Sequence, residues 1–141
     1  MKMSTKGRYG LRAMVDIAVN SIGGENCVSL KSVAERQDIS ERYLEQLIVP
    51  LKKAGIVKST RGAHGGYVLA RPAREITVGE ILRALEGPIK IVECSGAGEG
   101  CRSEVCKTCV TRGVWEKLSE SLSETAYAIT LETLAKQSMA Q

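Results

Sequence analysis

A short glycine-rich stretch between two β-prone runs, placed after three helical patterns, is the feature that most limits the folds open to this chain. The runs are Ile56–Ser59 and Tyr67–Leu69, and the tip between them is rich in glycine. Runs separated in this way are typical of a β-hairpin. Phe is absent and Trp115 is the only tryptophan. The core therefore has to be built mainly from Leu, Ile, Val and Ala, which favours small helices.

Three helical patterns precede the hairpin. The first has an apolar stripe at helical spacing and is expected to end at Gly23–Gly24; the stripe consists of Leu11, Met14, Val15, Ala18 and Ile22. Ser29 and Ser40 are good N-caps for the next two helices. Gly55 is the expected stop of the third helix. We expect Pro50 to kink this helix or to split off its last turn, because proline removes a backbone hydrogen bond.

Helix, helix, turn, helix and hairpin, in this order, predict a winged helix-turn-helix. After the hairpin, Thr77 and Glu80 form a capping-box pattern at the start of another helix. That helix is expected to run to Glu86 and to stop at Gly87 and Pro88. The predicted fold is therefore mostly α with a small β-hairpin wing.

A second apolar stripe crosses the C-terminal part of the chain and repeats every three or four residues; it consists of Val110, Val114, Leu118, Leu122, Ala126 and Ile129. A small chain offers too little surface to bury so long a stripe, and a second copy is the simplest partner. We therefore expect a homodimer. The predicted organisation is a winged helix-turn-helix DNA-binding domain over residues 1–88, a cysteine-rich loop over residues 89–109, and a dimerisation helix with a C-terminal tail over residues 110–141.

Charge is divided unevenly along the chain. Residues 1–90 contain fifteen Lys and Arg against nine Asp and Glu, whereas residues 91–141 contain five against seven. A basic excess confined to one part is typical of a nucleic-acid-binding module joined to a part with another task, although a solvated lysine-rich surface has the same composition.

The expected compartment is the cytoplasm. The segment Met1–Arg12 is basic and lacks the apolar stretch of a secretory signal. No apolar run is long enough to span a bilayer. Thiols stay reduced in the cytoplasm, where clustered cysteines more often bind metal or sense redox state than form disulfides.

The predicted DNA-reading residues lie in the third helix and in the hairpin. The outer face of the helix after Ser40 carries Arg42, Glu45 and Gln46. Gln pairs with adenine, Arg with guanine or phosphate, and Glu accepts from cytosine. A solvated helix face looks similar, so the hairpin is the deciding observation. There Arg61, with Lys58 nearby, is placed to enter a narrow minor groove.

Phosphate contacts are expected from the start of the first helix, where Lys6 and Tyr9 lie close to Arg8. His64, the only histidine, is expected to be a solvated loop residue. A Cys–His or Ser–His pair would have to bring it across the molecule, and no nucleotide-binding or hydrolase fingerprint is present. We therefore do not expect an enzyme.

Four of the five cysteines gather in one polar segment, as Cys94, Cys101, Cys106 and Cys109. Thiolates bind metal, and several on one loop can wrap one centre. Structural zinc sites usually show two C-x2-C pairs, whereas only Cys106–Cys109 has that spacing. Cys101-x4-Cys106-x2-Cys109 instead matches three ligands of plant-type [2Fe–2S] proteins. Zinc and a metal-free thiol switch remain alternatives. Cys27 is expected to be partly buried without a ligand role.

The segments that carry a family resemblance are "STKGRYGLRAMVDIA", "ERYLEQLIVPLKKAGIVKSTRGAHGGYVLARP", "ITVGEILRALEGP" and "CVTRGVW". Together they resemble the Rrf-two family of bacterial transcription regulators over nearly the whole chain. The resemblance implies a homodimeric winged-helix protein that binds a palindromic operator. Some members carry iron–sulfur clusters and others repress cysteine metabolism. It also implies that Arg42, Glu45 and Gln46 read the major groove and that Arg61 reads the minor groove.

The cluster ligands implied by this resemblance differ here in one position. Cluster-binding relatives can place a histidine three residues after the last cysteine, where this chain has Arg112. Arginine stays protonated and cannot bind iron, so we expect ligation by the four cysteines of the segment. The expected function is a dimeric repressor that senses iron–sulfur or redox status. The alternatives are a cysteine-metabolism repressor controlled by a partner protein and a zinc-stabilised adaptor.

Overall fold

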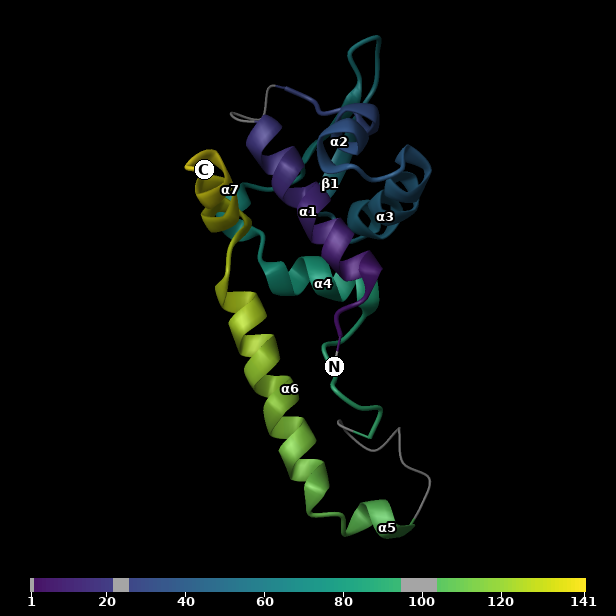
Figure 1. Ribbon diagram of the computed structural model, residues 1–141, viewed down its shortest axis with the longest axis vertical. Coiled ribbons are helices and arrows are strands. Elements are labelled where there is room, and N and C mark those ends of the chain that lie inside the picture. The colour runs from purple at the N-terminus through teal and green to yellow at the C-terminus, as the bar shows by residue number, and fades with distance from the viewer. Residues whose placement is uncertain (1, 22–25, 95–103) are drawn as a thin grey trace.

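The computed structural model describes residues 2–21, 26–94 and 104–141. Within these residues the chain forms seven α-helices, one 3-10 helix and a two-stranded antiparallel sheet (Figure 1). The elements in chain order are α1 (Thr5–Asn20), α2 (Leu30–Gln37), α3 (Glu41–Lys53), β1 (Val57–Thr60), β2 (Gly66–Leu69), η2 (Ala73–Glu75), α4 (Val78–Glu86), α5 (Glu104–Lys107), α6 (Thr111–Ala128) and α7 (Leu131–Met139). None of the helices in the described ranges is long and apolar enough to cross a membrane.

Helix α1 is the centre of the body, because it contacts α2, α3, α4 and α7 (Figure 1). Met14 and Ile17 are fully buried on its inner face. The buried face is therefore rotated from the predicted stripe, of which Leu11 and Val15 are only partly buried. The helix ends at Asn20, where its last backbone carbonyls are capped, and so stops before the predicted glycine pair.

The crossing of α1 over α4 depends on glycine. A Cβ built at Gly10 would collide with the side chain of Leu85, which is buried on α4. The absence of a side chain at Gly10 lets the two helices approach closely. Helix α4 itself begins with the predicted capping box, in which the Thr77 hydroxyl accepts from the Glu80 N–H and the Glu80 carboxylate accepts from the Thr77 N–H.

Helices α2 and α3 form the helix-turn-helix. Both predicted N-caps are confirmed, since Ser29 and Ser40 each accept a backbone N–H of the first turn. Asp38 ends α2 in the left-handed conformation and turns the chain toward α3. Of the two expected effects of Pro50, splitting off the last turn is wrong, because α3 continues through Pro50 to Lys53. Proline removes only its own N–H, so the residues after it can stay helical.

The hairpin forms the predicted wing, shifted by one residue at its first strand. Strands β1 and β2 pair from Val57 with Leu69 to Thr60 with Gly66. The wing is also attached to the body by a further bridge to β2, because Val28 and Tyr67 exchange two backbone hydrogen bonds of 2.8 Å. A Cβ at Gly66 would lie 2.6 Å from the Val28 carbonyl oxygen, so the bridge requires glycine there.

The predicted C-terminal stripe runs along one helix, α6, from its N-cap Val110 to its C-cap Ile129, and a further helix follows it. Helix α6 extends away from the body and carries α5 at its far end (Figure 1). The residues predicted as a tail instead form α7, which packs on α1 and η2. A bridge between Thr77 and Thr130 marks the point where the chain returns to the body. Leu131 follows this bridge and is fully buried.

Candidate nucleic-acid interface

The outer face of α3 presents the three residues expected to read the major groove. Arg42, Glu45 and Gln46 are all exposed. The opposite face of α3 is buried and consists of Leu44, Leu47, Ile48 and Leu51. Because the apolar face sets the rotation of the helix, the polar face must point to solvent. Three side chains capable of reading base edges therefore share one exposed surface.

The wing places a second group of polar residues beside this helix. Arg61 is exposed in the turn between β1 and β2, and Lys58 is exposed on β1. Gly62 has a φ of 120°, which a side chain rarely tolerates, so the turn needs glycine at that point. The Gly66 N–H donates to the Thr60 hydroxyl over 3.2 Å and closes the neck of the wing.

Helix α3 and the wing are joined directly. The Lys52 ammonium donates to the Ser59 hydroxyl over 3.0 Å. This contact connects the last turn of the recognition helix to the first strand. The sequence pattern gives no signal for it, because the two residues are ordinary surface side chains until the hairpin brings them together.

The start of α1 lies next to the start of α3. The rings of Tyr9 and Tyr43 meet edge to face, with centroids 6.1 Å apart. The guanidinium groups of Arg8 and Arg12 lie 5.7 and 5.4 Å from the Tyr9 ring centroid. Tyr9 is thus half-buried in packing, whereas Lys6 is exposed at the helix start. Of the two expected phosphate contacts, Lys6 has the greater freedom to reach DNA.

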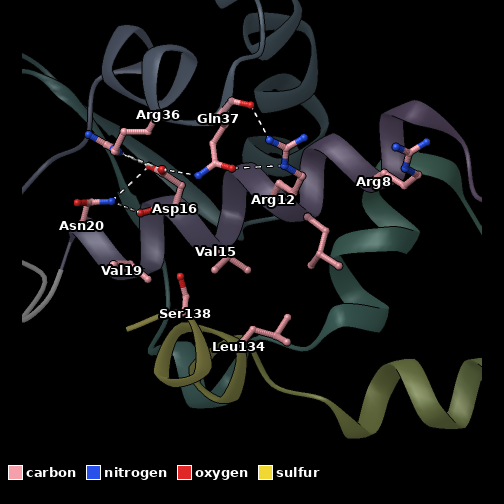
Figure 2. Close-up of a pocket in the computed structure, with 11 residues that line it drawn as sticks. Arg8, Arg12, Val15, Asp16, Val19, Asn20, Arg36, Gln37, Leu134 and Ser138 are labelled. Atoms are coloured by element: carbon pink, nitrogen blue, oxygen red, sulfur yellow. Dashed lines mark hydrogen bonds and ion pairs between the residues drawn. The ribbon is translucent and has the colours of Figure 1, made fainter. Parts of the chain in front are cut away.

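A polar network connects α1 with the end of α2 (Figure 2). Asp16 is 5% exposed and accepts two hydrogen bonds from the Arg36 Nε and one of 2.7 Å from Arg36 Nη2. The Gln37 amide donates to Asp16 Oδ2 over 2.9 Å. The hydrogen bond to Asp16 raises the pKa of Arg36, although partial burial opposes the shift. Sequence spacing does not reveal this network, because its members come from two helices.

Beside this network lies a groove of about 580 Å³ between α1 and α7 (Figure 2). Its apolar floor includes Val15 and Val19 of α1 and Leu134 of α7. Arg8 and Arg12 line it as well. Leu11 and Val15 of the predicted α1 stripe therefore pack at the edge of the core and also line this groove.

His64 is exposed near the tip of the wing, as expected. Its backbone carbonyl oxygen accepts from the Cys27 thiol over 2.9 Å. Cys27 is partly buried and carries a free thiol, which confirms its predicted environment.

The four expected metal ligands are only partly described. Cys94 lies beyond the end of α4, Cys106 lies on α5, and Cys109 lies between α5 and α6. Cys101 falls outside the described residues. Cys94 and Cys109 carry free thiols, whereas Cys106 is disulfide-bonded. Among the described side chains, no three carboxylates, imidazoles or sulfurs are close enough to hold a metal ion.

Cys109 lies among groups that lower the pKa of its thiol. The Thr111 hydroxyl lies 3.0 Å from its sulfur. This hydrogen bond, followed by those from the backbone N–H groups of Arg112 and Thr111, lowers the pKa of the Cys109 thiol. The deprotonated form is the one that binds metal, so the start of α6 favours ligation at this position. Arg112 makes an ion pair of 2.9 Å with Glu116.

Comparison with known proteins identifies the class. A family model named Rrf2 and described as an iron-dependent transcriptional regulator matches residues 3–137. The chain is 46% identical over 135 residues to the HTH-type transcriptional regulator CymR of Bacillus subtilis, covering 96% of this chain and 90% of that protein. It is 42% identical over 139 residues to the HTH-type transcriptional regulator IscR of Cereibacter sphaeroides, covering 99% of this chain and 90% of that protein.

Solved structures agree with the sequence relatives. The structure of CymR, described as the global cysteine regulator of B. subtilis, has a TM-score of 0.77 and 44% identity, covering 97% of this chain and 98% of that chain. The structure of T. potens IscR has a TM-score of 0.75 and 48% identity, covering 100% of this chain and 89% of that chain. The family model, the two relatives and the winged helix-turn-helix body point the same way, and the chain therefore belongs to the Rrf2 (Rrf-two) family of DNA-binding transcriptional regulators.

Proposed function

We propose that this chain is a homodimeric repressor that acts in the cytoplasm, binds a palindromic operator and responds to a [2Fe–2S] cluster held by its cysteines. The observation that carries the proposal is the exposed polar face of α3, with Arg42, Glu45 and Gln46, beside the wing with Arg61. A helix inserts such a face into the major groove, while an arginine on a wing reaches the neighbouring minor groove.

The proposed dimer rests on the surface of α6. Val110, Val114, Leu118 and Leu122 are 89%, 51%, 43% and 46% exposed. They lie on one side of a helix that projects from the body, so a single copy leaves them in water. A second copy, related by a two-fold axis, would cover both stripes at once and would bring two recognition helices to the two halves of a palindrome.

The cysteines have the chemistry that an iron–sulfur cluster requires, because such clusters are held by thiolates. Cys94, Cys101, Cys106 and Cys109 are the proposed ligands, and Cys106 must be reduced before it can bind iron. The lowered pKa of Cys109 supports its part in the set. The description of the family as iron-dependent and the likeness to IscR point in the same direction.

Regulation would follow from the position of these cysteines. Cys109 lies two residues before the start of α6, which is the helix proposed to meet the second copy. The Ile91 N–H donates to the Ser119 hydroxyl over 3.1 Å, so the segment leading to Cys94 also lies along α6. A change in cluster occupancy would then shift the relative placement of the two α3 helices. The free energy of DNA binding would change only by the difference in the free energy of cluster binding between the dimer that can bind DNA and the dimer that cannot.

A cysteine-metabolism repressor that is controlled by a partner protein is the second candidate. The likeness to CymR favours it, since identity to CymR is as high as identity to IscR over almost the whole chain. In that function the cysteine segment would act as a set of thiols or would hold zinc.

Absorbance of anaerobically purified protein separates these candidates. Iron–sulfur charge-transfer bands in the visible are expected, together with iron and sulfide in equal amounts. Protein that contains zinc, or no metal, and lacks these bands would contradict the cluster proposal and leave the second candidate standing.

Single cysteine variants test the ligand set. Alanine at any one of the four proposed ligands should lower the iron content and alter the electron paramagnetic resonance spectrum after reduction. Cys27→Ala is the matched control, because Cys27 is remote in sequence and bonded to the wing, and it should keep the cluster. An unchanged spectrum in Cys106→Ala would refute ligation by four cysteines.

A further inference from the structure

The carboxylate of Asp16 is the one buried acidic side chain on the inner helices of the described body, and DNA recognition as outlined above makes no use of it. Its side chain is 3% exposed. Arg36 Nε donates to it over 3.0 and 3.3 Å, Arg36 Nη2 over 2.7 Å and Gln37 Nε2 over 2.9 Å. Asn20 Nδ2 adds a longer contact of 3.4 Å from the same helix. The other three donor atoms belong to Arg36 and Gln37, the last two residues of α2.

A second contact joins the same two helices one turn earlier on α1. The Arg12 guanidinium donates to the Gln37 backbone carbonyl oxygen over 2.6 Å and to the Gln37 side-chain oxygen over 3.4 Å. Gln37 is thus held from two positions on α1, through its side chain by Asp16 and through its backbone by Arg12 (Figure 2). We call Arg12, Asp16, Arg36 and Gln37 the α1–α2 clamp.

Stability alone is a weak reason for such a clamp. Removing a carboxylate and a guanidinium from water costs free energy that their attraction only partly returns, and an apolar replacement is often as stable. What an ion pair of this kind adds is direction, because a bidentate arginine–carboxylate pair fixes both distance and angle. Apolar packing is non-directional and fixes neither.

Direction matters at α2 because this helix is short and only one of its side chains is fully buried. That residue is Val33, with Leu30 and Ala34 partly buried against the core, whereas α3 buries four residues. Such apolar packing is non-directional and does not by itself fix the angle of a two-turn helix. The clamp therefore supplies the orientation that packing does not.

The orientation of α2 passes directly to the recognition helix. Only Asp38, Ile39 and Ser40 separate Gln37 from the first residue of α3. Two backbone hydrogen bonds to the Ala34 carbonyl, from Asp38 and Ile39, make this turn tight. A rotation of α2 on α1 would move the start of α3, and with it Arg42, relative to the wing.

We propose that Asp16 is a positioning residue for operator recognition: through Arg36 and Gln37 it sets the angle at which α3 enters the major groove. This inference rests on the proposed reading of DNA by α3. Loss of the clamp should lower affinity for the specific site more than affinity for unrelated DNA, because misplaced base contacts are lost while phosphate contacts adapt.

The experiment uses the duplex that the wild-type chain selects from a random-sequence pool, and an unrelated duplex of equal length. Asp16→Asn keeps the shape of the side chain and removes its charge. We expect it to weaken binding to the selected duplex by about 10- to 100-fold, on the scale of one or two mismatched base pairs, with less than about 3-fold change on the unrelated duplex. Glu35→Gln is the control, because it removes an exposed carboxylate from α2, the helix to which Asp16 is bonded.

A second variant keeps the test decisive if Asp16→Asn folds poorly. Gln37→Ala leaves the Asp16–Arg36 ion pair in place and removes the side-chain bond to α1. It should weaken binding to the selected duplex by about 3- to 10-fold on the same grounds. Equal losses on both duplexes in these variants would overturn the proposal.

A double-mutant cycle with Glu45→Ala identifies the route of the effect. If Asp16 acts through α3, Asp16→Asn should weaken binding to the selected duplex clearly less in the Glu45→Ala background than in the wild-type background. The base contact of Glu45 is already absent in that background, so it cannot be misplaced. Independent, additive losses would assign Asp16 a purely stabilising role and overturn the proposal. A wild-type chain that selects no duplex at all would instead contradict the proposed function.

Discussion

Arg61 and Glu80 represent the two kinds of contribution that a single side chain makes in this molecule. Arg61 is exposed at the wing tip, where its side chain is free to reach a partner. Glu80 is partly buried at the start of α4 and is hydrogen-bonded within the chain. The first should matter for binding without affecting folding, and the second should matter for folding without touching DNA.

We predict that Arg61→Ala weakens binding to the selected duplex by about 1–3 kcal/mol, the scale of one good groove contact. The melting temperature and the dimer mass should not change, because the side chain is exposed. Fluorescence anisotropy measures the affinity. Arg74→Ala, at an exposed arginine of η2, controls for loss of charge. Wild-type affinity in Arg61→Ala would remove the wing tip from the interface.

Glu80 should make stability depend on pH. Burial raises the pKa of Glu80, but hydrogen bonds from the Thr77 N–H and the Arg71 guanidinium outweigh it, so the pKa is lowered. A lowered pKa means stability that is present at neutral pH and is lost as pH falls through the folded-state value. Glu80→Ala should therefore cost about 0.5–2 kcal/mol at pH 7.

The difference in the free energy of unfolding between wild type and Glu80→Ala should narrow as the pH falls below the usual pKa range of a glutamate. Urea unfolding at several pH values measures it. Glu75→Ala, at an exposed carboxylate on η2, is the comparison. A difference that stays constant down to the acid limit would show that the charge of Glu80 is irrelevant to the cap.

At the scale of elements, α6 is a helix that leaves several large apolar side chains exposed to water in a single copy. These side chains lie along the length of α6. The contact between α6 and α4 lies near the C-terminal end of α6 (Figure 1). The contact there is close, because a Cβ at Gly79 would collide with the ring of Tyr127. One end of α6 is therefore fixed to the body while the other end needs a partner.

We predict that Leu122→Glu dissociates the proposed dimer. Each copy would lose burial of one leucine, worth about 1.5–3 kcal/mol, so the dimer dissociation constant should rise by roughly 100-fold or more. Sedimentation equilibrium measures it. Glu120→Lys changes charge on a different face of α6 and should leave the constant nearly unaltered. A Leu122→Glu protein with wild-type mass at low concentration would place the interface elsewhere.

The elements that the sequence predicts well are those with local signals. Ser29, Ser40 and Thr77 act as N-caps through neighbours three residues away, so the pattern alone suffices. Pro50 does not split off the last turn of α3, because proline removes only its own N–H, and its carbonyl oxygen still accepts from the Ala54 N–H. Helix α7 and the Asp16 network were missed because both depend on contacts between residues far apart in the chain.

At the scale of the whole molecule, charge and shape divide the chain in the same way. The basic excess belongs to residues 1–90, which contain the helix-turn-helix and the wing, whereas residues 91–141 are slightly acidic. Electrostatic attraction to DNA is thus concentrated in the part that carries the candidate interface. The slightly acidic part that contains α6 adds nothing to this attraction.

This division predicts a strong dependence of binding on salt. A dimer that makes roughly 6–10 phosphate contacts should lose about 10³–10⁵ in affinity between 50 and 200 mM salt. Anisotropy titrations of the selected duplex across a salt series measure the slope. Lys6→Ala should reduce it by about one unit per copy, if Lys6 contacts a phosphate. A flat series would argue against a nucleic-acid interface altogether.

The return of α7 to α1 has a consequence for biosynthesis. Leu131 and Ala135 are buried in the body that α1 begins, so the DNA-binding body is assembled from both sides of the cysteine segment. A ribosome releases α1, the wing and α4 well before it releases α7. During that interval the groove side of α1 lacks its cover, and the nascent chain exposes apolar surface of the kind that chaperones bind. The body that includes α7 is thus completed only after the cysteine segment, residues 89–109, has been translated.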